Sequence, residues 1–195
     1  MTTEKCETED CVVFRLFDKI DMETFSRLQN EMFFLITKEV EDRENLRPVL
    51  LISSGGGSFE VSLSIFSFLQ QLPQDLTTIA LGCTESAAAI IYMAGKTRFV
   101  TPTTLLQFHR GLFSMNNCPY AEVMSTARYY LKKHRLMAEI LADAAKISIK
   151  TSTRWLRDGA SFSADEAVAK GLAHGVLKES FLFSGLSTVE KSIKV

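Results

Sequence analysis

Residues 81–95 read LGCTESAAAIIYMAG, the end of an apolar strand pattern followed by a polar turn and an alanine-rich segment. The segment after the turn is apolar on every side, which is typical of a buried helix. Ser86 stands at the start of that helix, where serine is most often an N-cap. The alternative is a nucleophile at a strand-to-helix turn, where backbone N–H groups can face a developing oxyanion. The turn alone leaves both interpretations open.

Strand and helix patterns alternate on both sides of this turn. Strands are predicted at 11–17, 48–53, 76–82, 97–102, 104–109 and 176–183. Helices are predicted at 22–40, between 59 and 72, after residue 86, and at 121–145, 150–157 and 163–172. This order predicts a single α/β domain over residues 1–195, built of stacked βαβ units with a mostly parallel sheet. We expect residues 1–10 to be disordered and the long helix 121–145 to project from the domain.

The composition excludes several classes of protein. The net charge is −1 with acids and bases interspersed, which gives no support for a nucleic-acid or membrane partner. The four cysteines form no CxxC pair and have no histidine at metal-ligand spacing. We therefore predict no metal and no cofactor, and a reduced, cytoplasmic location. The apolar runs are too short to span a membrane.

Three other positions could carry chemistry beside Ser86. The loop of residues 54–58 holds three glycines but lacks the Lys-Ser/Thr of a phosphate-binding loop, so its alternatives are a flexible turn and an oxyanion hole using the Gly57 N–H. His109 ends an apolar run and becomes a base only if a serine lies nearby. Asp158 follows the helix pattern at 150–157, where the helix dipole disfavours a carboxylate. A surface aspartate is the simpler interpretation of Asp158 taken alone.

The order of these segments resembles the proteolytic subunit of Clp protease, the ClpP family. The resemblance covers roughly residues 48–177 and rests on four segments, ISSGGGS (52–58), GCTESAAA (82–89), QFHRG (107–111) and RDGASFSADEAVAKGL (157–172). It implies a ClpP/crotonase-like fold and a serine endopeptidase that hydrolyses peptide bonds through an acyl-enzyme. By position it implies Ser86 as nucleophile, His109 as general base and acid, and Asp158 as the residue that orients the imidazole. The N–H groups of Gly57 and Ala87 would bind the oxyanion.

The resemblance also implies peptide or unfolded-protein substrates and a homo-oligomeric ring. Some positions depart from the family pattern. Gly55 replaces a proline, Glu85 adds a negative charge beside the nucleophile, and one residue is inserted between Asp158 and Ser163. Only about ten polar residues precede the first strand, where the family has its axial loops. This argues against an AAA+ ATPase partner.

Two alternatives remain open at this point. A catalytically silent ring component would explain Glu85 and Gly55. A crotonase-like acyl-CoA enzyme would also use backbone oxyanion holes after glycine-containing loops, but it would not need Ser86, His109 and Asp158 together.

Overall fold

A twisted sheet forms the centre of the computed structural model, which describes residues 11–37, 45–111 and 114–177. Five parallel strands run in the order β1-β2-β3-β4-β7. Their bounds are β1 Cys11–Leu16, β2 Arg47–Ser54, β3 Thr77–Glu85, β4 Thr97–Val100 and β7 Gly175–Val176. The short strands β5 (Leu105–Gln107) and β6 (Ser161–Ser163) complete the sheet; β5 pairs parallel with β3, and β6 pairs antiparallel with β5. The predicted α/β fold with a mostly parallel sheet is confirmed.

The helices follow the strands as the sequence patterns predict. They are α1 Met22–Met32, α2 Phe59–Leu69, α3 Ala87–Tyr92, α4 Tyr120–Ala145, α5 Ile149–Asp158 and α6 Ala164–Ala169, with a short 3-10 turn at Phe33–Leu35. Asp21 caps α1, because its side chain accepts a hydrogen bond from the Thr24 N–H at 3.0 Å. All six residues of α3 are buried, as its apolar composition requires. No helix in the described ranges has the length and apolar character that a membrane crossing needs.

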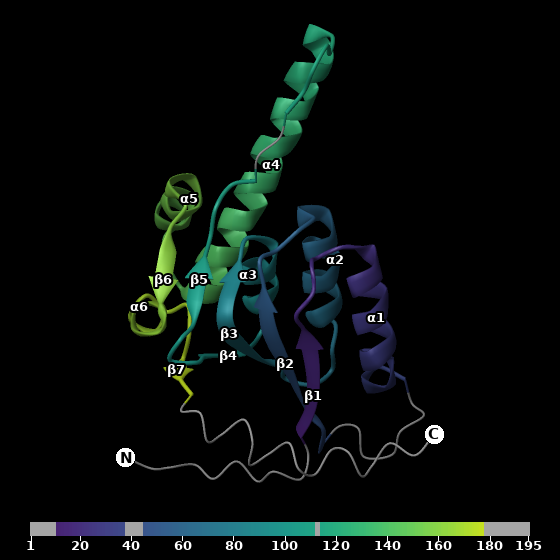
Figure 1. Cartoon of the computed structure of the whole chain (residues 1–195), viewed down its shortest axis with the longest axis vertical. Helices are drawn as coiled ribbons and strands as arrows, with labels where there is room; N and C mark the ends of the chain where they lie inside the picture. Colours follow the sequence, from purple (N-terminus) through teal and green to yellow (C-terminus); the bar gives the residue numbers. More distant parts are fainter. Residues whose placement is uncertain (1–10, 38–44, 112–113, 178–195) are drawn as a thin grey trace.

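Helix α4 projects far beyond the other elements, as expected for the long helix predicted at 121–145 (Figure 1). Its buried residues all lie in its C-terminal half. Its N-terminal half carries large exposed apolar side chains, among them Tyr120, Val123, Met124, Tyr129 and Leu131.

The structure corrects several predicted boundaries. Strand β3 continues to Glu85 instead of ending at residue 82, because its second half leaves β4 and pairs with β5. Gly82 lies at this change of partner with φ 53°, a conformation that glycine adopts readily. The predicted helix 22–40 ends at Met32, and its residues 38–40 lie outside the described part of the chain.

The C-terminal segments also differ from their predicted bounds. The helix predicted at 163–172 is the shorter α6, preceded by β6, which the sequence patterns did not indicate. The strand predicted at 176–183 begins as β7, and its residues 178–183 lie outside the described ranges. Residues 1–10, predicted to be disordered, also lie outside them.

Candidate active site

Ser86 occupies an unusual backbone conformation between β3 and α3. Its φ of 55° and ψ of −120° lie far from the extended conformation of an N-cap residue. Its side chain makes no capping hydrogen bond, whereas the serines that precede α2, α5 and α6 all accept one. The turn is held by its backbone, since the Ser86 N–H donates to the Gln107 carbonyl at 2.9 Å. The N-cap interpretation of Ser86 is therefore wrong.

The glycine loop packs directly against this turn. Gly56 has φ 93°, and a Cβ added to it would lie 2.9 Å from the Cβ of Ser86 and 3.1 Å from the amide nitrogen of Ala87. A Cβ on Gly57 would lie 2.3 Å from the carbonyl oxygen of Ile20. The loop therefore fills the narrow space between the β1–α1 connection and Ser86, and side chains at these two positions would not fit.

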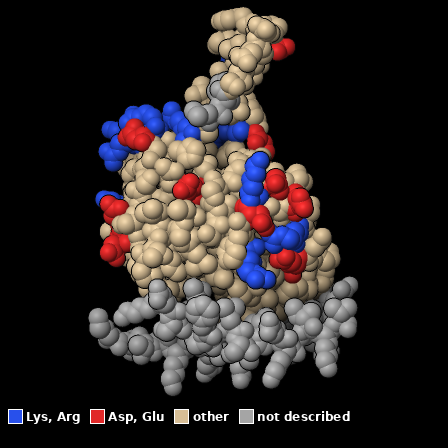
Figure 2. All heavy atoms as spheres, in the orientation of Figure 1, with Lys and Arg blue, Asp and Glu red and all other residues tan. Residues whose placement is uncertain are grey.

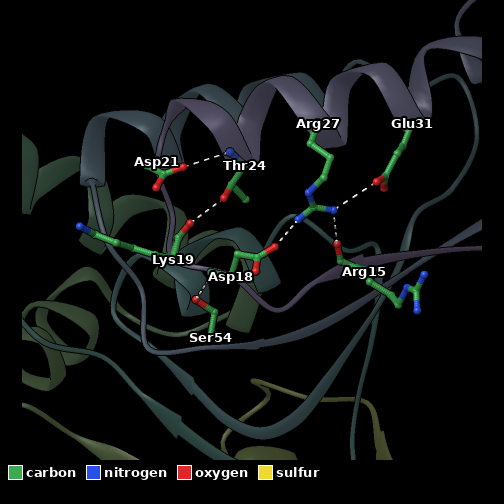
Figure 3. A network of polar contacts seen from close by, with 8 residues as sticks. All are labelled: Arg15, Asp18, Lys19, Asp21, Thr24, Arg27, Glu31 and Ser54. Atoms are coloured by element: carbon green, nitrogen blue, oxygen red, sulfur yellow. Dashed lines mark hydrogen bonds and ion pairs between the residues drawn. The ribbon is translucent and has the colours of Figure 1, made fainter.

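A buried serine fixes the start of the loop. Ser54 Oγ accepts from the Gly56 N–H at 3.1 Å and donates to the carbonyl of Asp18 at 2.7 Å. The side chain of Asp18 pairs in turn with Arg27 of α1, at 2.6 Å (Figure 3). The connection between β1 and α1 thus holds the start of the glycine loop in place through the hydrogen bond between Ser54 and Asp18.

Two backbone N–H groups beside Ser86 keep their hydrogen-bonding capacity free. Neither the Gly57 N–H nor the Ala87 N–H donates to any residue in the described ranges. The neighbouring Gly56 N–H is occupied by Ser54 Oγ. The two free donors belong to the two segments that pack together at Ser86.

His109 lies two residues beyond β5, which pairs with the end of β3. Its Nδ1 is 2.9 Å from the carbonyl oxygen of Arg110. A carbonyl oxygen only accepts, so Nδ1 carries the hydrogen and Nε2 of the neutral ring has a free lone pair. The register that joins Glu85 to Gln107 brings His109 to the same edge of the sheet as Ser86.

Asp158 is the last residue of α5, which extends one residue beyond the end of the helix predicted at 150–157. Its exposed carboxylate pairs with Arg157, whose Nε and Nη2 donate at 2.7 and 3.2 Å. These hydrogen bonds lower the pKa of Asp158 below its ordinary value. The backbone at this helix end lies near His109, because a Cβ on Gly159 would be 4.0 Å from the Cβ of His109. Within the described residues, no hydrogen bond joins the side chains of Ser86, His109 and Asp158.

Comparison with known proteins matches the model of one family, Clp protease, over residues 8–180. The chain belongs to the Clp protease family. It is 26% identical over 172 residues to the ATP-dependent Clp protease proteolytic subunit of Ligilactobacillus salivarius, covering 79% of this chain and 87% of that protein.

Two further relatives match shorter stretches. The chain is 30% identical over 130 residues to the chloroplastic ATP-dependent Clp protease proteolytic subunit 4 of Arabidopsis thaliana, covering 66% of this chain and 44% of that protein. It is 30% identical over 128 residues to the proteolytic subunit of Carsonella ruddii, covering 63% of this chain and 65% of that protein.

The roles of two residues at the site of this Clp protease family chain were not predicted from the sequence. Ser54 and Gly56 were not distinguished from their neighbours, because nothing in the run SSGGGS marks which members meet Ser86. Positive φ values at Gly56 and Gly57 follow from packing against other segments.

The surface beside the site carries an uneven charge. Figure 2 shows basic side chains gathered where α5 lies, whereas acids and bases alternate over α1. The exposed bases of α5 include Lys150, Arg154 and Arg157. Among the described residues, no three His, Cys, Asp or Glu side chains lie close enough together to hold a metal ion.

Proposed function

We propose that this chain is a serine endopeptidase that hydrolyses peptide bonds through an acyl-enzyme at Ser86. The observation that carries the proposal is the uncapped, positive-φ conformation of Ser86 between the end of β3 and the buried helix α3. Such a strained turn presents a hydroxyl to substrate, as in the strand-to-helix nucleophile turn of other hydrolases. Membership of the Clp protease family supports the same activity.

His109 would act as the general base and then as the general acid. A serine hydroxyl is a weak nucleophile at neutral pH, so its proton must pass to a nearby base as it attacks the carbonyl. The Nδ1–H of His109 is already engaged by the Arg110 carbonyl, which leaves Nε2 as the accepting nitrogen. Once the Asp158 carboxylate leaves Arg157, it would accept the hydrogen bond from Nδ1–H of His109 and stabilise the imidazolium.

The N–H groups of Gly57 and Ala87 would bind the oxyanion of the tetrahedral intermediate. Both donors are free of partners in the described ranges and belong to segments that meet at Ser86. Preorganised donors of this kind lower the barrier because they need no reorientation as charge develops.

Labelling with a serine-directed fluorophosphonate, read by peptide mass spectrometry, tests this function. We expect modification at Ser86 and turnover of a fluorogenic peptide, both lost in Ser86→Ala. An unlabelled wild-type protein without turnover would contradict the proposal.

A second candidate function is a catalytically silent member of a ring. The observation that favours it is that no hydrogen bond joins His109 and Asp158 within the described residues, because each of them has another partner. The same labelling experiment decides, because a silent subunit would leave Ser86 unmodified. The family match favours either of these functions over an acyl-CoA enzyme.

The proposed enzyme works as a homo-oligomeric ring on peptides or unfolded proteins in the cytoplasm. The exposed apolar side chains on the projecting half of α4 support association, because such a surface is normally covered. Sedimentation at micromolar concentration is expected to show a species much larger than the 21.8 kDa chain. A monomer alone would contradict the ring. Co-purification with an AAA+ ATPase would show that such a partner, which the sequence analysis left possible but doubtful, is used.

A further inference from the structure

Lys133 lies where α4 leaves the body of the domain. The buried residues of α4 begin at Met137, and most residues before Lys133 are exposed. The side chain of Lys133 is nevertheless only 10% exposed. A nearly buried ammonium group is costly unless charged and polar partners surround it. Its partners therefore show what it does.

The ammonium group of Lys133 is enclosed by one carboxylate and three aromatic rings. Nζ forms an ion pair with Oε1 of Glu60. It lies 4.9 Å from the ring centroid of Phe59, 5.3 Å from that of Tyr129 and 4.5 Å from that of Tyr130. These distances are within the range of attractive cation–π interactions. Glu60 and Phe59 belong to the first turn of α2, so the cluster joins α4 to the start of α2.

Glu60 links Lys133 to the glycine loop, because its carboxylate contacts both Lys133 and Ser58. Its Oε1 also accepts from the Tyr129 hydroxyl at 3.4 Å, and its Oε2 accepts from Ser58 Oγ at 3.2 Å. The hydrogen bond from Lys133 is the main cause that lowers the pKa of Glu60. Ser58 follows Gly57 directly and caps α2 by accepting from the Val61 N–H.

The glycine loop that ends at Ser58 is in turn in contact with Ser86. The Ser58 N–H donates to the Ile20 carbonyl at 2.8 Å, which fixes one side of the loop. Gly56, two residues before Ser58, packs against Ser86. The loop is thus held by Ser54 at its start and by Ser58 at its end, and the Ser58 hydroxyl donates to the carboxylate that pairs with Lys133 of α4.

We propose that Lys133 is a positioning residue for the peptidase reaction: through Glu60 and Ser58 it holds the glycine loop in place beside Ser86. The inference rests on the proposed function, because its kinetic consequence needs Ser86-dependent catalysis. A loop released from α4 still binds the peptide but presents its N–H groups less accurately to the oxyanion. The loss then falls on kcat more than on KM.

The experiment compares Lys133→Met with Lys132→Met, a matched change at an exposed neighbouring lysine. Lys133→Met is expected to lower kcat about tenfold or more with KM within about twofold, whereas Lys132→Met changes neither. Lys133→Arg keeps the charge and the ring contacts and is expected to restore most of the lost kcat. An unchanged kcat in Lys133→Met would overturn the proposal.

Hydrogen exchange gives a second readout that does not depend on activity. The amides of residues 56–61 are expected to exchange faster in Lys133→Met than in the wild type or Lys132→Met. If the wild type shows no Ser86-dependent turnover, the proposed function fails and this measurement alone decides the anchoring. Equal exchange in the three proteins would overturn it. Should Lys133→Met not fold, as judged by circular dichroism, Glu60→Gln is measured in the same way with the same expected outcomes.

Discussion

Ser86 and Ser163 stand at two strand-to-helix junctions of the same chain, and the two junctions differ in every respect that matters for chemistry. Ser163, between β6 and α6, has φ −66° and ψ 171° and forms a capping box with Glu166. Ser86, between β3 and α3, has φ 55° and ψ −120° and caps nothing. Both serines are followed by alanine, so local sequence does not separate them.

The strained backbone of Ser86 is imposed by the segments that pack around it. At Ser163 the backbone is relaxed, and the hydroxyl is used up in hydrogen bonds to Glu166. At Ser86 the turn is fixed by the Gln107 carbonyl and the packed glycine loop, and the hydroxyl is left free within the described ranges. A strained turn persists only when its surroundings hold it, and that is commonest at functional sites.

The largest expected effect is on activity at the uncapped junction. Ser86→Ala and His109→Ala should each lower peptidase activity on the order of 10³-fold or more, and the double variant should lose little further. Thermal unfolding of Ser86→Ala should match the wild type, because Ser86 Oγ makes no hydrogen bond with the described residues. If peptidase activity persists in Ser86→Ala, Ser86 is not the nucleophile, and the two junctions do not differ in function.

Asp158→Asn comes next, with an expected loss of about 10²-fold in kcat/KM. The loss should be smaller than the roughly 10⁴-fold effect of an aspartate that already orients the imidazole. The reason is that the Arg110 carbonyl holds Nδ1–H in the present arrangement, while Asp158 is paired with Arg157. A loss as large as that of Ser86→Ala would show that Asp158 contacts His109 throughout the working enzyme. Unchanged activity would remove Asp158 from the mechanism.

Gly56→Ala tests the packing that strains the Ser86 junction. The added Cβ would meet the Glu85 carbonyl and the Ser86 Cβ at 2.9 Å, in a backbone conformation that disfavours alanine. We expect the free energy of unfolding to fall by about 1–3 kcal/mol, measured by urea denaturation. Gly55→Ala is the matched control, because a Cβ there meets no atom within 4 Å. Equal stability of the two variants would contradict the close approach.

The smallest effect is expected at the capped junction. Ser163→Ala should cost about 1 kcal/mol of stability and leave kcat/KM unchanged, which is the reverse of Ser86→Ala. Chemical denaturation and a peptide assay on the same samples measure both quantities. A loss of activity without loss of stability in Ser163→Ala would contradict this assignment.

The capping box also predicts a pH dependence. Hydrogen bonds from Ser163 lower the pKa of Glu166 below its ordinary value of 4.5. A lowered carboxyl pKa stabilises the fold fully above the ordinary value, and the stabilisation is lost as the pH falls toward the folded-state pKa. The difference in stability between wild type and Ser163→Ala should therefore shrink below about pH 4.5. A difference that is constant from pH 7 to pH 3 would contradict the role of the ionised Glu166.

Sequence patterns predicted the strands and helices where the pattern was long and strongly apolar or periodic. The run PVLLIS became β2, and the long pattern from residue 121 became α4. Short elements were less predictable: β6 has three residues, and the second half of β3 pairs with β5 and, at Thr84, with the end of β2. Such segments take their structure from a partner strand that local sequence does not reveal.

The α/β architecture, the family and the candidate reactive residues could be predicted from the sequence, because burial patterns are visible within single segments and the motifs follow one another in a characteristic order. How those residues are held follows from contacts in the folded chain. The free N–H groups at Gly57 and Ala87 and the backbone conformation of Ser86 depend on segments far apart in the chain, whereas the hydrogen bonds of His109 and Asp158 join each of them to an adjacent residue. Hydrogen-bond partners and backbone strain are set by whatever packs nearby, and at Ser86 that is the glycine loop and β5.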